Sequence, residues 1–442
     1  MTDLSIAGLG LDIERWVPST EGPRELAWTT GFLRIDLGEE CLTLGEDAWS
    51  RSLESSVLVS AYPMALWLAS STWRLLYECG PQRREKELSW RLAHHLASAG
   101  HGYLWPSLVF RSDGARVEIE AQPTPRAAKQ ARHFFGAATG EVSLESLLKS
   151  IARFVELVLE RLRATDGGGS DLERLWQRVI EEGQDPELSW RRRLEAALGL
   201  DADEMPLALT RQLDGLVAVA GREGGLEVAA ARAGEEPLPW LAQVDERARR
   251  CGLRAQALAS LAKQGAAALP ARNARAEAIR APWQRGIEAA RALRRAVGLG
   301  NEPISQARLA ELVGLRASEL EDGASGFDPA LGLAIVEDDA VRLHLRKRHA
   351  HARRFELARC IGDLMGAASG DPWRPISDAI TVRQKMQRAF AAEFLCPIEG
   401  LRARYGDDTS EDAVLDARDR FLVSEQVIEM QRRNHAASTD AA

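Results

Sequence analysis

Two stretches in the last third of the chain decide the fold: Arg353-Arg-Phe-Glu-Leu-Ala-Arg-Cys-Ile-Gly-Asp-Leu364 and Arg383-Gln-Lys-Met-Gln-Arg-Ala-Phe-Ala-Ala-Glu-Phe-Leu-Cys-Pro397. We expect each stretch to form a helix. In the first, Arg359 and Asp363 are four residues apart, so they would share one helical face and can form an ion pair there. If that face is buried, the pair would add little net stability, because its desolvation offsets its attraction.

Both stretches resemble the helix motifs of the ImmA/IrrE family of zinc metallopeptidases. The matching framework residues are Arg354, Phe355, Leu357, Ala358, Ile361 and Gly362 in the first stretch, and Phe390, Ala391, Ala392, Glu393, Leu395 and Pro397 in the second. The resemblance extends over roughly residues 272–434. Within it, residues 281–298 resemble a lead-in helix, 331–336 and 340–345 resemble short strands, and Phe421-Leu-Val-Ser424 resembles a late helical element.

The resemblance also implies where the metal chemistry would lie. In an HExxH helix, two histidines on one face bind zinc, and the glutamate beside the first takes a proton from the zinc-bound water. Here the histidine positions hold Arg359 and Asp363, the base position holds Cys360, and the acidic third ligand aligns with Gln384. A guanidinium offers no lone pair, and a neutral amide is a poor zinc ligand. We therefore expect a vestigial site with no catalytic residue, no metal ion and no cofactor.

Hydrophobic patterning predicts an α+β protein that is predominantly helical. We expect an aromatic-rich α/β domain of unknown role at 1–140, a helical domain at 141–270, the degenerate, zincin-like ImmA/IrrE-like domain at 271–436 and a flexible tail at 437–442. Alternating runs predict strands at 31–37 and 115–121, and helical spacing predicts helices at 64–77, 89–98, 147–162, 171–182, 188–198, 207–219 and 238–268. We expect the many tryptophans of the first 140 residues to pack in a core.

Bulk composition favours a soluble cytoplasmic protein. The net charge of -8 opposes general attraction to nucleic acid or membranes, and no apolar run approaches the length of a membrane-spanning helix. The N-terminus lacks a signal-peptide pattern. Five dispersed cysteines without a CxxC pair indicate reduced thiols rather than disulfides or a zinc ribbon. None of these features indicates an oligomeric state.

Two groups of histidines provide alternative metal sites: His344, His349 and His351 before the first motif, and His94, His95 and His101 near the N-terminus. For the first group we expect a place in a solvated basic stretch. For the second we expect divergent rings, because adjacent residues on a helix point about 100° apart.

Other residues suggest further chemistries. A basic run, which suggests nucleic-acid binding as the alternative to a solvated face, comprises Arg342, Arg346, Lys347, Arg348, Arg353 and Arg354. Cys360 as a nucleophile would need an activating base, so we expect burial instead. An acidic set of nuclease-like composition, with no lysine at the expected spacing, comprises Asp113, Glu118 and Glu120.

These observations predict a non-catalytic, ImmA/IrrE-like regulatory or protein-binding protein. Working members of the family cleave helix-turn-helix repressors, so the resemblance implies a protein partner in stress-response, mobile-element or antiviral regulation. One alternative is a metallo-endopeptidase of the family with an unconventional metal site. The other is an unknown enzyme in the N-terminal domain with the C-terminal domain as its sensor, which a polar pocket among Trp67, Trp73, His94 and Trp105 would favour.

Overall fold

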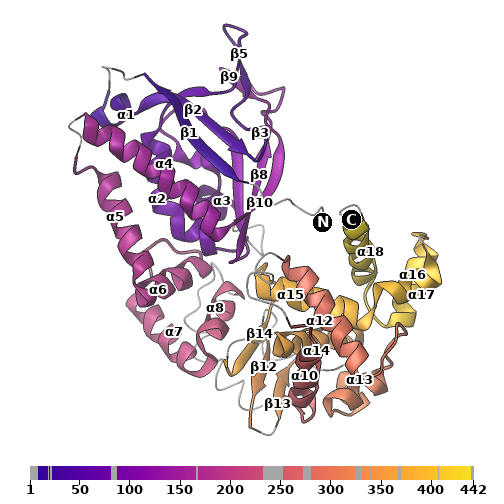
Figure 1. Ribbon diagram of the computed structural model, residues 1–442. Coiled ribbons are helices and arrows are strands. Elements are labelled where there is room, and N and C mark those ends of the chain that lie inside the picture. The colour runs from indigo at the N-terminus through magenta and orange to yellow at the C-terminus, as the bar shows by residue number, and fades with distance from the viewer. Residues whose placement is uncertain are drawn as a thin grey trace. The chain divides into compact units, whose positions relative to one another are not determined.

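The computed structural model describes residues 8–17, 19, 22–80, 87–165, 168–231, 252–271, 280–321, 323, 331–338, 340–366, 370–406 and 408–439. The chain divides into two compact units, an N-terminal unit that ends at Met205 and a C-terminal unit that begins at Pro206 (Figure 1). Helices account for about 53% of the structure and strands for about 18%. The predicted α+β class is confirmed at this coarse level.

The described part of the N-terminal unit contains three antiparallel sheets. In the largest, the central strand pairs with three others: β2 (Thr30–Leu37) with β1 (Leu9–Trp16), β3 (Glu40–Cys41) and β6 (Val57–Ser60). The second has the order β10 (Ala138–Ser143), β8 (Arg116–Gln122), β7 (Ser107–Ser112), and the third has the order β5 (Leu53–Glu54), β4 (Gly45–Asp47), β9 (Arg132–Phe134). β2 and β8 alternate buried and half-buried residues, which is the period-two pattern that predicted them.

The helices of the N-terminal unit are α1 (Arg24–Trp28), α2 (Tyr62–Tyr77), α3 (Glu87–His94), the 3-10 turn η2 (Leu96–Ala99), α4 (Leu144–Ala164), α5 (Asp171–Gln184) and α6 (Pro186–Ala197). α2 is buried over nearly all of its length and contacts α4, α5 and α6. Trp67, Trp73, Trp90 and Trp105 are buried, so the expected packing role is confirmed for these indoles. Trp49, which is 87% exposed, is an exception.

The helical middle region does not form a unit of its own. α4 begins after Ser143, whose Oγ accepts a hydrogen bond from the Ser146 amide at 3.0 Å, and its apolar face is buried in the N-terminal core. α7 (Leu207–Ala220) and α8 (Arg222–Ala231) belong instead to the C-terminal unit, where both contact β14 (Trp373–Ile376). The predicted boundaries after residues 140 and 270 therefore differ from the observed division, because α4 packs on α2 and β1, whereas α7 and α8 pack on each other and on β14.

A four-stranded antiparallel sheet organises the C-terminal unit, in the order β11 (Leu253–Ala255), β13 (Val341–His344), β12 (Gly332–Val336), β14. β12 and β13 are the two strands that were expected. The helix predicted over 238–268 is wrong at its centre, because residues 253–255 pair with β13; of the described residues in this range, only those of α10 (Leu258–Ala267) are helical. Residues 232–251 lie outside the described residues. β14 was not predicted.

Among the described residues, the remaining elements of the C-terminal unit are α12 (Pro282–Ala296), α13 (Gln306–Val313), η3 (Ala317–Leu320), α14 (Ala350–Met365), α15 (Val382–Leu395), α16 (Ile398–Tyr405), α17 (Glu411–Phe421) and α18 (Glu425–Thr439). α14 and α15 are the two quoted stretches, so both predicted helices are confirmed. They approach closely at Gly362, where an added Cβ would lie 2.5 Å from Cγ of Phe390. The expected late helical element at Phe421–Ser424 is instead a junction, because Leu422 adopts φ 53° between α17 and α18.

No helix in the described residues combines the length and hydropathy that crossing a membrane requires. Cys41, Cys79, Cys360 and Cys396 are not in disulfide bonds, and Cys251 lies outside the described residues.

Candidate functional site

The vestigial positions of the motif lie in one buried polar core in the C-terminal unit. Arg359, Cys360 and Asp363 come from α14, and Gln384 comes from the first turn of α15. All four residues are buried, and none is more than 3% exposed. The close packing of the two helices at Gly362 allows polar groups on α14 to reach those on α15.

Arg359 does not pair with Asp363, so the predicted ion pair within α14 is wrong. Its Nη2 instead donates to the Ser377 carbonyl oxygen at 2.6 Å and to Oε1 of Gln384 at 2.5 Å. Its Nε has no hydrogen-bond partner among the described residues. The guanidinium therefore links three parts of the chain: α14, α15 and the segment that follows β14.

Asp363 pairs with an arginine from the facing helix. Nε and Nη2 of Arg383 each donate to one carboxylate oxygen at 2.6 Å, and Nε2 of Gln387 donates at 3.0 Å. This two-pronged geometry explains the correction, because parallel N–H groups of a planar guanidinium match both carboxylate oxygens. Burial opposes ionisation of Asp363, but the charge and hydrogen bonds of Arg383, together with the Gln387 bond, outweigh it and lower the pKa of Asp363.

Gln384 is the hub of the core. Its Oε1 accepts from Arg359 and, at 3.0 Å, from the Ser377 amide. Its Nε2 donates to the Pro375 carbonyl oxygen at 3.0 Å and to Oε2 of Glu227 at 2.8 Å. These four bonds use the full capacity of a side-chain amide, which leaves no lone pair on Oε1 for a metal ion.

Glu227 on α8 is a site residue that the sequence patterns did not single out. Its carboxylate also accepts from the Thr381 hydroxyl at 3.0 Å. Burial raises the pKa of Glu227 above its ordinary value. The only available signal was a lone acidic residue beside the apolar run Val228-Ala-Ala-Ala231, and that pattern does not reveal a partner more than 150 residues away.

Burial shifts the other titratable groups of the core away from metal or nucleophilic chemistry. Burial, together with the neighbouring charges of Arg388 and Arg346, lowers the pKa of Arg359 to about 9, so the guanidinium still carries its proton at neutral pH. Burial and the carboxylates of Glu356 and Asp363 raise the pKa of the Cys360 thiol well above its usual range. The reactive thiolate is therefore disfavoured, which agrees with the expected burial of Cys360.

The residues present do not fit the zinc ion that the family resemblance implies. A protonated guanidinium occupies one histidine position, and the other holds a carboxylate that accepts hydrogen bonds from Arg383 and Gln387. Among the described residues, no group of three or more histidine, cysteine, aspartate or glutamate side chains is placed to hold a metal ion.

The histidines considered as alternative zinc ligands each have their own surroundings. In the C-terminal group, His344 is buried in β13, His349 precedes α14, and His351 lies in its first turn. In the N-terminal group, each ring has its own partners: Glu78 and the Phe110 carbonyl for His94, Ser107 and the Ala97 amide for His95, and the Ala99 carbonyl for His101. Neither group forms a shared ligand set in the described residues.

The basic run before and within α14 is largely internal rather than a solvated face. Arg346 bonds Glu356 and Asp378, and Arg354 is fully buried against the Ile304 carbonyl and Gln306. Arg353 donates to the carbonyl oxygens of Lys347 and Glu319. The solvated-face interpretation is therefore wrong for these three arginines, because each is a structural donor.

The N-terminal unit has a pocket of about 340 Å³ bounded by Trp67, Trp73, Arg74, Glu182 and Asp201, among others. His94 and Trp105, which were expected in such a pocket, are not among its lining residues. The Trp73 indole donates to Glu182 at 2.9 Å, and Arg74 donates to Asp201 at 3.2 Å.

The acidic set at β7 and β8 has structural partners. Asp113 accepts from the amides of Ala115 and Arg116, which closes the turn between these strands. Glu118 and Glu120 both pair with Arg111. These three carboxylates therefore have structural roles in the β7–β8 hairpin.

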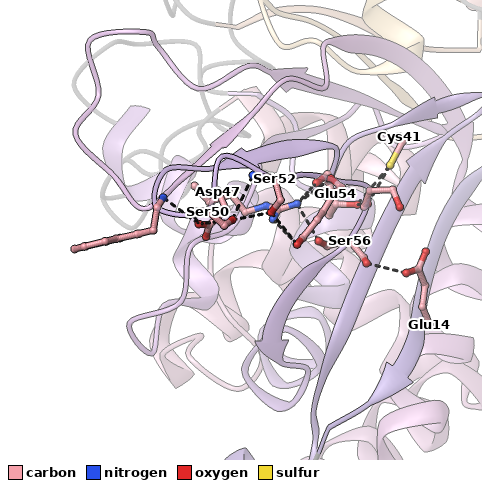
Figure 2. Close-up of polar contacts among 11 residues, drawn as sticks. Glu14, Cys41, Asp47, Ser50, Ser52, Glu54 and Ser56 are labelled. Carbon is pink, nitrogen blue, oxygen red and sulfur yellow. Dashed lines mark hydrogen bonds and ion pairs between the residues drawn. The ribbon is translucent and has the colours of Figure 1, made fainter.

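A second polar cluster, seen in Figure 2, stabilises the β4–β5 hairpin of the N-terminal unit. Asp47 accepts from the amides of Trp49 and Ser50, and the Ser56 hydroxyl donates to Glu14 at 2.7 Å. Buried Arg132 donates to the carbonyl oxygens of Thr43, Glu54 and Ser56. The cluster fixes the hairpin that carries the exposed Trp49.

Comparisons with known proteins found no relative of this chain. No protein-family model matches the chain, and no curated protein and no solved structure is significantly similar to it. The ImmA/IrrE resemblance therefore rests on the quoted residues.

Proposed function

We propose that this chain is a non-catalytic regulatory protein whose C-terminal unit, an ImmA/IrrE-like domain without metal chemistry, binds a protein partner. The observation that carries the proposal is the Arg359–Gln384 hydrogen bond. Two positions that would both hold metal ligands in a working peptidase are bonded to each other, and both are buried. A role in stress-response, mobile-element or antiviral regulation follows from the resemblance alone.

A groove in the C-terminal unit supports the binding part of the proposal. It has a volume of about 1060 Å³ and runs between α12 and α16. Its apolar wall includes Trp283, Ile287 and Ile398. Charged residues of both signs lie beside that wall, among them Arg295, Arg402, Glu288 and Glu399. This combination suits a partner segment with an apolar face flanked by charged residues, because complementary charge steers and orients association.

Metal content tests the non-catalytic part of the proposal. Protein purified after growth with added zinc should contain far less than one zinc per chain. Stoichiometric zinc that is lost in Asp363→Ala or His349→Ala protein would overturn the proposal in favour of an unconventional metallopeptidase.

Partner capture with matched variants tests the binding part. A partner retained by the wild type should be lost with Ile287→Glu, which places a charge on the apolar wall of the groove. Leu207→Glu is the control, because Leu207 is 74% exposed and lies on α7, outside the groove. Equal capture by all three proteins would contradict binding in the groove.

The N-terminal pocket favours a second candidate, an enzyme with the C-terminal unit as its sensor. Aromatic walls with a few charged groups are typical of small-molecule sites. A metabolite that stabilises the wild type in a thermal-shift screen, but not Asp201→Asn protein, would support this candidate. A screen in which both proteins respond alike would contradict it.

A further inference from the structure

One carboxylate of the polar core comes from a helix that precedes the sheet in the sequence. Glu227 on α8 accepts hydrogen bonds from the Thr381 hydroxyl and the Gln384 amide. Both donors are neutral. The positive charges of Arg383 and Arg388 interact electrostatically with the carboxylate.

The two donors belong to the N-terminus of α15. Thr381 caps this 14-residue helix, because its Oγ accepts from the Gln384 backbone amide at 3.1 Å. The partial positive charge of a helix N-terminus favours an anion there. The hydroxyl, the side-chain amide and the helix end thus form one anion-binding arrangement, and a buried carboxylate already occupies it.

α8 is intrinsically a weak helix. It has ten residues and contains two adjacent glycines, Gly224 and Gly225. Each internal glycine costs roughly 1 kcal/mol relative to alanine, and a helix this short is marginal in water without tertiary contacts. Its helical state therefore depends on docking.

Two acidic groups hold α8 against the rest of the C-terminal unit. Asp371 accepts from the Gly224 amide at 3.1 Å, and Glu227 reaches the core one turn later. Gly224 permits the close approach, because an added Cβ would lie 3.1 Å from the Trp373 carbonyl oxygen. Loss of the Glu227 contact would leave Thr381 and Gln384 with free donors beside two arginines.

We propose that Thr381 and Gln384 at the start of α15 form a carboxylate-binding site, that Glu227 fills it as an internal ligand, and that an acidic side chain of a protein partner competes for it. The identity of the competitor rests on the proposed protein-binding function. The carboxylate site itself does not, and it is tested without any partner.

Chemical rescue tests the site. Glu227→Ala removes a fragment with the size and charge of acetate, so this variant should unfold at a lower temperature. Sodium acetate, at ionic strength matched with sodium chloride, should raise that temperature in a saturable manner. Wild type and Glu223→Ala, an exposed acidic position on the same helix, should not respond. A folded Glu227→Ala protein that ignores acetate would overturn the proposal.

Glu227→Gln provides a second test if the alanine variant does not fold. The neutral amide keeps the size of the side chain but loses the charge, so the α8 amides should exchange hydrogen about tenfold faster, the ratio expected for loss of one charge-assisted bond. The amides of α10 should not change. Unaltered exchange in α8 would overturn the proposal. If acetate rescues the variant but no partner requires the groove, the carboxylate site is supported and the proposed protein-binding function is contradicted.

Discussion

Arg359 supplies the polar core with a cation that is part of the chain. Its Nη2 satisfies two buried acceptors, the Ser377 carbonyl and the Gln384 amide oxygen. We predict that Arg359→Met lowers the free energy of unfolding by about 2–4 kcal/mol, because a buried acceptor without a donor costs about 1–3 kcal/mol. Urea denaturation measures the change, with the exposed Arg295→Met as the matched control. A variant as stable as the wild type would show that this cross-link contributes nothing.

Asp363 should give the C-terminal unit a pH-dependent stability. Its pKa is lowered in the folded protein, so its contribution is present above the ordinary value of 3.8 and is lost as pH falls through the folded value. At pH 7, Asp363→Asn should cost about 3 kcal/mol or more, because it leaves Arg383 buried without its carboxylate. The stability curves of the two proteins should converge below pH 4.

Denaturation between pH 7 and pH 3 measures this convergence. Asp419→Asn is the control, because Asp419 forms an exposed pair with Arg418 and should change the curve far less. Parallel curves for wild type and Asp363→Asn would show that the ion pair does not titrate with folding.

The chemistry of the vestigial positions was predictable from residue types, but their pairing was not. That Arg359 offers no lone pair to a metal ion, and that the neutral amide of Gln384 is a poor zinc ligand, follows from the residue types alone. The partner of Asp363 depends on competition between Arg359 on its own helix and Arg383 on the facing helix. The packing of α14 on α15 decides that competition, and this packing cannot be predicted from residue spacing along one helix.

At the scale of elements, α14 and α15 offer a direct test of the resemblance. We predict that Arg359→His, Cys360→Glu, Asp363→His and Gln384→Glu together create a zinc site, because histidines at positions i and i+4 share one face opposite a carboxylate. Arg383→Gln should accompany them, because Arg383 loses its partner. Elemental analysis should find about one zinc per folded chain, and the control is a protein that carries the other four substitutions but keeps Arg359. A folded variant without zinc would contradict the resemblance.

The contact between α14 and α15 also predicts that a glycine-to-alanine substitution has opposite effects on stability at two positions. Gly362→Ala should lower the free energy of unfolding by about 1–3 kcal/mol, because the new methyl group overlaps the Phe390 ring. Gly215→Ala in α7 is the matched control, because nothing lies within 4 Å of its added Cβ. It should raise stability by up to about 1 kcal/mol. Thermal unfolding that shifts in the same direction for both would contradict this packing.

Elements with strong local patterns were predictable, and those defined by pairing were not. α4, β2 and β8 carry clear periodicity and α2 is a long, largely apolar run, and all four formed as expected. β11 and β14 have three and four residues, too few for a pattern, and they exist because β13 and β12 pair with them. The same limit explains why the helix predicted across residues 253–255 was wrong.

At the scale of the whole molecule, the chain should unfold in two steps, one for each compact unit. Nine of the twelve tryptophans precede Pro206, so fluorescence should report mainly the N-terminal unit while circular dichroism reports both. Asp363→Asn should shift only the step that fluorescence follows weakly. A single transition that moves as a whole would show that the units unfold together.

The guanidinium at the centre of the polar core changes what this protein requires from its surroundings. A fold held by zinc exists in loaded and empty forms, and its competence follows metal supply and chelation. A cross-link made by Arg359 is synthesised with the chain and cannot be withdrawn. The amount of competent protein would then follow translation and turnover alone and would not change as zinc in its environment rises and falls.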